Sequence, residues 1–239
     1  MPCQAFVAER ALASLAMGQV HIERGWLAGE HLREVRGAAS LMLTRRGRGG
    51  TVGLDSATGA SRLDASARRC LTVDLLSEET FDSLRATCPS LLSLLEQLDE
   101  LRAELAARGR PLLPESEVQL LRYDVGGHYA RHIDDGLGMA QQPVCRSVSL
   151  LLYLTPEDWS EQDGGRLRCF YGGEGAEPAR HVDIPPAAGT LLLFDSATLP
   201  HEVLPTARER VVCVGWFLTR RVDRAGRPRR TEVQKVQGS

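Results

Sequence analysis

Short apolar segments in the second half of the chain constrain the fold most strongly. From residue 116 onwards, β-like segments recur between glycine, proline and aspartate residues. This spacing is typical of an all-β sandwich or barrel. The expected strands cover residues 118–123, 148–154, 165–171, 181–184, 190–194 and 211–219.

The first half of the chain has helical spacing instead. Leucines three and four residues apart, opened by Pro89 and closed by Gly109, predict a long core-packing helix. A helical half that supports a β half predicts one α+β domain over residues 1–219, with its β core at about 116–219. The expected elements are helices over 4–16, 30–43 and 89–108, a helix start at Ser77, and strands over 20–26 and 70–75.

Two further segments lack large apolar side chains. Residues 45–69 are rich in Gly, Ser and Arg, and we expect a mobile loop there, because a loop of this length inside a domain is usually functional or disordered. Residues 220–239 hold seven basic and two acidic residues, so this tail is net +5 and the rest of the chain −7 of a total of −2. We expect a frayed, disordered tail, with a localisation signal or a substrate contact as the alternative.

Composition excludes several classes of protein. With 43% hydrophobic and 25% charged residues, the chain resembles an ordinary globular protein, and no apolar run is long enough for a membrane span. The charge balance outside the tail argues against nucleic acid as a partner. Six dispersed cysteines without a CxxC pair predict free thiols and a reducing compartment, the cytoplasm or also the nucleus. We separately expect a monomer.

The chemistry concentrates in the segment YDVGGHYARHIDDG, residues 123–136. In an extended segment His132 and Asp134 point to the same face and can grip one ion. His201, 67 residues after Asp134, follows an apolar strand and completes the two-His, one-carboxylate set of non-haem Fe(II) oxygenases. The alternative is that His132 caps a turn and Asp134 is a solvated turn residue.

Arg210 lies nine residues after His201 and opens the strand VVCVGWF. Because side chains alternate along a strand, Arg210 can point into a barrel interior, where a guanidinium is costly unless it is paired. A dicarboxylic co-substrate would supply that partner bidentately. Since 28 of the 29 basic residues are Arg, only the position of Arg210 relative to His201 carries this argument.

These motifs in order resemble the Fe(II)/2-oxoglutarate dioxygenases of the prolyl 4-hydroxylase family. HEVLPTARER with VVCVGWF, and SLLLYLTPEDW with GGRLRCF, are similar to the oxygen-sensing prolyl hydroxylases that modify hypoxia-inducible factor. The N-terminal GQVHIERGWLAGEHLREVRGAASLM is also similar to that group, so the resemblance runs from about residue 10 to 219. The segment DGLGMAQQP does not follow the group closely, which leaves the target open.

The resemblance implies a double-stranded β-helix of eight strands in two facing sheets, with helices along one side. It implies that Fe(II), 2-oxoglutarate and O2 are used, together with ascorbate. It also implies a loop at 45–69 that folds over the bound peptide. The implied roles are iron ligands and catalysis for His132, Asp134 and His201, co-substrate binding for Arg210, Tyr153 and Tyr123, and substrate binding for Arg146, Tyr129 and Trp216.

The resemblance therefore indicates a peptidyl-proline 4-dioxygenase that acts on a protein containing a target proline, with oxygen sensing as one use of that activity. Three of these residues also have a structural interpretation. Arg146 could be a surface arginine, Trp216 a core tryptophan, and Tyr153 a strand aromatic with a solvated hydroxyl. Two other functions stay open. One is a 2-oxoglutarate dioxygenase acting on a free amino acid or other small molecule, and the other is a non-enzymatic, metal-bound β-barrel module.

Overall fold

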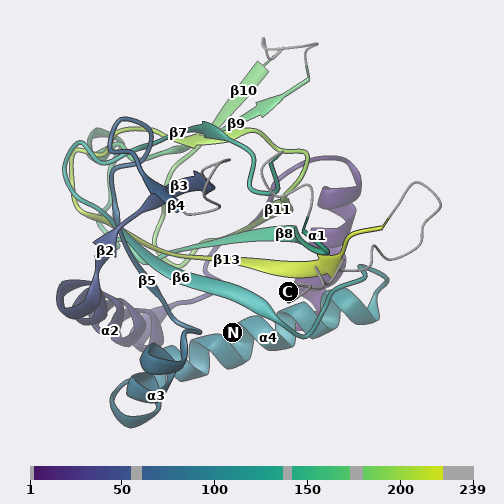
Figure 1. The fold of residues 1–239 in the computed structure, drawn as a ribbon, viewed down its shortest axis with the longest axis horizontal. Helices are drawn as coiled ribbons and strands as arrows, with labels where there is room; N and C mark the ends of the chain where they lie inside the picture. The colour runs from purple at the N-terminus through teal and green to yellow at the C-terminus, as the bar shows by residue number, and fades with distance from the viewer. Residues whose placement is uncertain (1–2, 55–60, 137–141, 173–179, 223–239) are drawn as a thin grey trace, which may run out of the picture.

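The computed structural model describes residues 3–54, 61–136, 142–172 and 180–222, and Figure 1 shows their arrangement. The helices are α1 (Gln4–Ala16), α2 (Gly29–Arg46), α3 (Glu78–Thr87) and α4 (Pro89–Ala107). All four agree with the helices expected from the sequence. In the described parts of the chain, no helix combines the length and the apolar character that a membrane span requires.

Helix α4 forms where it does because of its leucine stripe. Pro89 occupies the first turn, where its missing N–H costs no hydrogen bond. Five leucines on one face are at most 2% exposed and pack into the core: Leu91, Leu94, Leu98, Leu101 and Leu105. In Figure 1, α4 lies beneath the strands of the larger sheet.

The larger sheet has seven antiparallel strands in the order β1-β11-β8-β13-β6-β5-β2. Their bounds are β1 (His21–Glu23), β11 (Leu191–Asp195), β8 (Val144–Tyr153), β13 (Arg210–Arg220), β6 (Ser116–Tyr123), β5 (Leu71–Asp74) and β2 (Arg48–Gly49). A smaller sheet has the order β10-β9-β12-β7. Its strands are β10 (Arg180–Ile184), β9 (Leu167–Tyr171), β12 (His201–Val203) and β7 (Tyr129–His132).

Strand β13 shows how the larger sheet serves two cores. Val211, Cys213 and Phe217 join the cluster that includes the helices, whereas Val212 and Val214 join the cluster that includes residues of the smaller sheet. This follows from the two-residue alternation of side chains along a strand. Fully burying a side chain of this kind stabilises the fold by about 1.5–3 kcal/mol. One face of the larger sheet therefore packs against the helices, and the other faces the smaller sheet (Figure 1).

The sequence predicts the long strands well and the short ones poorly. The six strands expected in the second half are confirmed, and the strand expected at 20–26 is reduced to β1. Strands β7 and β12 were not expected. The tail from residue 223 onwards lies outside the described residues.

The expectation of a loop over 45–69 is wrong for residues 45–46, 48–49, 51–54 and 61–63, whereas residues 64–69 are turn and irregular structure with one isolated β-bridge at Arg68. Helix α2 extends to Arg46, β2 pairs with β5, and a hairpin of β3 (Thr51–Leu54) and β4 (Ser61–Leu63) follows. Pairing with neighbouring backbone stabilises strands in this Gly-, Ser- and Arg-rich segment, a tertiary effect that composition does not record. Residues 55–60 lie outside the described residues.

Gly189→Ala is expected to destabilise the fold by about 3 kcal/mol or more, because a positive φ alone costs on the order of 1–3 kcal/mol. Gly189 has φ +68°, and an added Cβ would lie 1.8 Å from the carbonyl oxygen of Leu27. Urea unfolding measures the loss. Gly109→Ala is the matched control, because its φ is +100° and no atom lies within 4 Å of the added Cβ. Equal losses in the two variants would contradict this account.

Candidate metal centre

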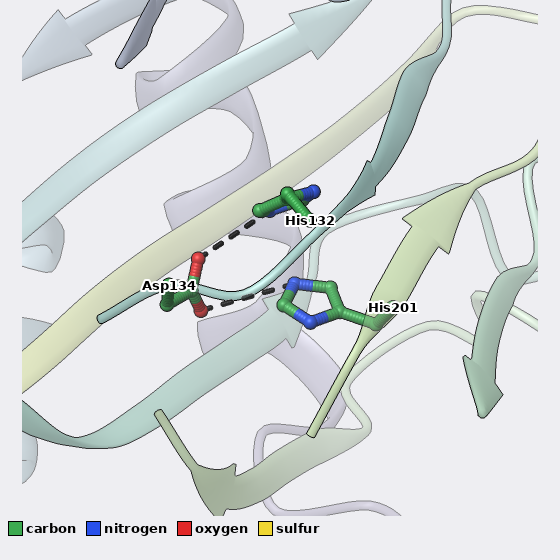
Figure 2. A group of neighbouring side chains, drawn as sticks. All are labelled: His132, Asp134 and His201. Carbon is green, nitrogen blue, oxygen red and sulfur yellow. Dashed lines mark ion pairs between the residues drawn. The ribbon is translucent and has the colours of Figure 1, made fainter. Parts of the chain in front are cut away.

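The pairing of two short strands brings His132, Asp134 and His201 together. His132 ends β7 and His201 begins β12, and these two residues face each other in the antiparallel register. Asp134 follows β7 by two residues. Figure 2 shows the three side chains converging on one point.

One ligand atom from each residue of this triad lies within 4.8 Å of the others. The Nε2 atom of His132 is 3.4 Å from Oδ1 of Asp134, and Nε2 of His201 is 3.8 Å from Oδ2 (Figure 2). The two imidazole centroids are 4.3 Å apart. This spacing can place three donor atoms around one ion.

Backbone carbonyls fix which ring nitrogen of each histidine faces the centre. Nδ1 of His132 is 2.9 Å from the oxygen of Ala130, and Nδ1 of His201 is 3.0 Å from the oxygen of Leu199. Because a carbonyl oxygen only accepts, each Nδ1 donates its proton. Each Nε2 then keeps a free lone pair, which is the arrangement that metal-binding histidines require.

The protonation states suit a cation. Burial would raise the pKa of the Asp134 carboxyl, but His201, His132 and the Ser149 hydroxyl hold that pKa well below its usual range. Burial, with a contribution from His132, lowers the pKa of His201 to about 4. At neutral pH the centre therefore offers a carboxylate and a neutral imidazole, the forms in which these groups bind metals.

Arg210 is fully buried. It contacts Tyr123 and Tyr153, which belong to the same intersheet cluster as Phe194, the ring that contacts His201. None of its three guanidinium nitrogens has a hydrogen-bond partner among the residues that the structure describes. Its guanidinium carbon lies 5.1 Å from each of the Tyr123 and Tyr153 ring centroids. Two ring faces offset part of the cost of burying this charge, but its hydrogen-bonding capacity is left for a ligand.

The rings of Tyr153 and Tyr123 pack against Arg210. The Tyr153 hydroxyl is buried and has no partner in the described part of the chain. Burial raises the pKa of Tyr153 to about 12, and burial also raises the pKa of Tyr123. Both hydroxyls therefore keep their protons at neutral pH. Together with Arg210 they can donate hydrogen bonds to a carboxylate.

Of the other residues expected at the site, Tyr129 contacts the triad, whereas Arg146 and Trp216 contact each other. Tyr129 stacks on the His132 ring with centroids 3.7 Å apart. Arg146 is ion-paired with Glu117, and its guanidinium carbon lies 3.7 Å from the Trp216 ring centroid. Trp216 is 6% exposed and its Nε1 has no hydrogen-bond partner in the described residues.

Sequence reasoning missed two residues near the triad. Ser149 donates a 2.6 Å hydrogen bond to Oδ2 of Asp134, and its hydroxyl within a run of buried apolar residues is a signal that could have revealed it. Arg68 lies over the Tyr129 ring at 4.7 Å. The abundance of arginine in this chain leaves no sequence signal for Arg68.

Known proteins with a similar sequence support the assignment of this metal centre. Residues 118–218 match the 2OG-Fe(II) oxygenase superfamily, a range that contains the triad and Arg210. Residues 118–218 therefore resemble a 2OG-Fe(II) oxygenase domain. This confirms the resemblance expected from the motifs at the level of the oxygenase domain. The match implies Fe(II), 2-oxoglutarate and O2, and the donor set described above fits the metal and a carboxylate ligand.

Three proteins show how far the likeness to the oxygenase domain extends. A PKHD-type hydroxylase of Parvibaculum lavamentivorans is 35% identical over 112 residues, covering 47% of this chain and 45% of that protein. The chain thus spans less than half the length of this relative. A Pseudomonas putida prolyl-4-hydroxylase structure has a TM-score of 0.71 at 24% identity and covers 92% of this chain and 100% of its own. The structure of a Trichoplax adhaerens prolyl hydroxylase in complex with a hypoxia-inducible-factor peptide fragment has a TM-score of 0.69 at 23% identity and covers 90% of each chain.

Proposed function

We propose that this chain is an Fe(II)- and 2-oxoglutarate-dependent dioxygenase that hydroxylates a prolyl residue of a protein substrate. The observation that carries the proposal is the fully buried Arg210 guanidinium, which has no hydrogen-bond partner among the described residues and shares one core with the triad. A buried cation without a partner is strongly unfavourable. A dicarboxylate that reaches from the triad to Arg210 would remove that cost.

The roles of the side chains follow from this arrangement. His132, Asp134 and His201 would hold Fe(II), and Arg210 with Tyr153 would bind the distal carboxylate of 2-oxoglutarate, with Tyr123 beside them. Iron and 2-oxoglutarate supply the oxygen-activating chemistry when bound. The chain contributes binding, orientation and the exclusion of water by the surrounding apolar side chains.

The two sheets support the fold part of this proposal. We infer that they form a double-stranded β-helix, in which the smaller sheet faces β6, β8, β11 and β13 of the larger one. Side chains from both sheets meet in a single cluster between them, which includes Leu121, Leu151, Leu167 and Ile184. We also propose that residues 1–219 make one domain, because the helices pack on the outer face of the same larger sheet.

A peptide is the substrate class that the surroundings of the triad favour. The segment after β4 runs beside β7: Ala130 N donates to the oxygen of Ala67 at 2.7 Å, and Arg69 N to that of His128 at 2.9 Å. Arg68 forms a β-bridge with Tyr129. This places residues 64–69 next to the strand that ends in His132, where they can contact an extended substrate. The peptide in the Trichoplax adhaerens structure supports the same class.

The substrate-side roles differ in how well they are supported. Tyr129 stacks on a triad imidazole and is well placed to contact a substrate. The charge of Arg146 is already paired with Glu117, so this residue would act through the indole of Trp216 rather than as a free cation. Dependence on ascorbate, oxygen sensing and the expected compartment stay predictions.

Incubation of cell extract with the protein, Fe(II), 2-oxoglutarate and ascorbate under ¹⁸O2 is expected to label proline residues of a protein. Mass spectrometry should find a hydroxylated proline that carries ¹⁸O, with stoichiometric succinate. Free proline and a mixture of free amino acids form the second arm. Succinate coupled only to free amino acids would contradict the peptide class, and no succinate in either arm would favour the non-enzymatic module.

A further inference from the structure

Ser149 is a polar residue in an apolar strand. It lies on β8 opposite Trp216 of β13 and Phe194 of β11, and it is 0% exposed. Its face of the strand continues with Leu151 and Tyr153. A hydroxyl buried in such surroundings costs free energy unless it is hydrogen-bonded, so its partners show what the serine does.

The hydroxyl of Ser149 is bonded to the Asp134 carboxylate. It donates to Oδ2 at 2.6 Å, a short distance typical of a charge-assisted bond. A hydroxyl can donate only one hydrogen bond, and Ser149 donates it to Asp134. The 2.8 Å contact between the hydroxyl oxygens of Ser149 and Ser196 must therefore be donated by Ser196.

Ser196 is held by two backbone hydrogen bonds. It is also 0% exposed. The backbone N of Ser196 donates to the carbonyl oxygen of Ser147 at 3.1 Å, and the carbonyl oxygen of Ser196 accepts from the backbone N of Asp135 at 2.9 Å. The backbone of Ser196 thus connects β8 to the segment that carries Asp134. Because its backbone is fixed in this way, the Ser196 hydroxyl holds the Ser149 hydroxyl in place through their hydrogen bond.

The two oxygens of Asp134 are consequently not equivalent. Oδ2 accepts the hydrogen bond from Ser149 and lies 3.8 Å from Nε2 of His201, whereas Oδ1 lies closer to a histidine, 3.4 Å from Nε2 of His132. A carboxylate whose second oxygen accepts a strong hydrogen bond is held in one rotamer and has a less basic lone pair on that oxygen. Oδ1 is then the better ligand atom.

We propose that Ser149, supported by Ser196, is a positioning residue that makes Asp134 bind the metal through Oδ1 alone. A carboxylate that used both oxygens would take a second coordination position, which the co-substrate or O2 needs. The inference rests on the proposed function, because it assumes the metal. Partners of ligating carboxylates typically contribute about 10- to 100-fold to metal affinity or activity.

Co(II) binding by Ser149→Thr and Ser149→Val tests this inference in the intact protein. The two replacements have nearly the same shape, so any cost of the extra methyl group is shared, and they differ in the hydroxyl. We expect the Val variant to bind Co(II) about 10-fold or more weakly than the Thr variant, with an altered visible absorption spectrum of bound Co(II) only in the Val variant. Thermal unfolding should give the two variants similar midpoints.

A second pair covers the case in which the added methyl group prevents folding. Ser196→Ala removes the donor to Ser149 without adding volume and should also weaken Co(II) binding. Ser147→Ala is its control, because the Ser147 hydroxyl accepts from Arg110 at 2.9 Å instead of facing Asp134. It should leave Co(II) affinity unchanged.

The outcomes separate the inference from the proposed function. Equal affinities and spectra for the Thr and Val variants, or for the Ser196→Ala and Ser147→Ala variants, would overturn the positioning role while leaving the metal site standing. If the unmodified protein does not bind Co(II) at all, the proposed function falls and the inference falls with it.

Discussion

His201→Ala is expected to lower Fe(II) affinity by more than about 100-fold, because a ligand should matter more than the 10- to 100-fold typical of the partners behind it. Succinate formation should fall below detection. The physical reason is that the variant keeps only two of the three donor groups of the triad, His132 and Asp134. Fe(II) titration under anaerobic conditions and a succinate assay measure both effects.

His181→Ala is the matched control for this prediction. His181 is an exposed histidine of β10 in the same four-stranded sheet, and its ring faces Phe170 at 6.3 Å. Affinity and turnover should stay at the level of the unmodified protein. Undiminished succinate from the His201→Ala variant would refute the assignment of the triad.

Arg210→Met is expected to have opposite effects on co-substrate binding and on the stability of the protein without ligands. Truncating one partner of a buried charge pair costs about 2–5 kcal/mol, so the 2-oxoglutarate requirement should rise about 30-fold or more. The same change removes a fully buried guanidinium that has no hydrogen-bond partner among the described residues. The ligand-free variant should therefore be more stable by about 1 kcal/mol or more, since buried charges often cost more than apolar residues of similar size.

Two measurements decide the role of Arg210. Urea unfolding without ligands gives the stability, and titration with 2-oxoglutarate in the presence of Mn(II) gives the affinity. Arg208→Met is the control, because Arg208 is 38% exposed and pairs with Asp158 at 3.1 Å. An unchanged 2-oxoglutarate affinity in the Arg210→Met variant would remove the anchor role, whatever happens to stability.

The helices and long strands are the part of the fold that could be predicted from the sequence. The leucine stripe of α4 and the apolar alternation of β13 are regular enough to identify each element locally. The two-residue spacing of His132 and Asp134, and the place of His201 after an apolar strand, predicted the triad, whose ligand atoms the structure brings within 4.8 Å of one another. The position of Arg210 nine residues after His201 predicted a buried guanidinium, and Arg210 is fully buried.

What the sequence could not predict depends on contacts between distant segments. Strands β7 and β12 have four and three residues, too few for a periodic pattern, and they exist because they pair with each other. Arg146 pairs with Glu117 across the sheet, and Ser149 acts through a carboxylate 15 residues earlier in the chain. Local propensity contains no information about such partners.

A crystal structure with Mn(II) and 2-oxoglutarate, grown without oxygen, tests the central claim most directly. The account predicts one Mn(II) bound by Nε2 of His132, Nε2 of His201 and a carboxylate oxygen of Asp134. It also predicts that the distal carboxylate of 2-oxoglutarate is hydrogen-bonded to Arg210 and Tyr153. A metal bound elsewhere, or a 2-oxoglutarate whose distal carboxylate leaves Arg210 unpaired, would contradict it.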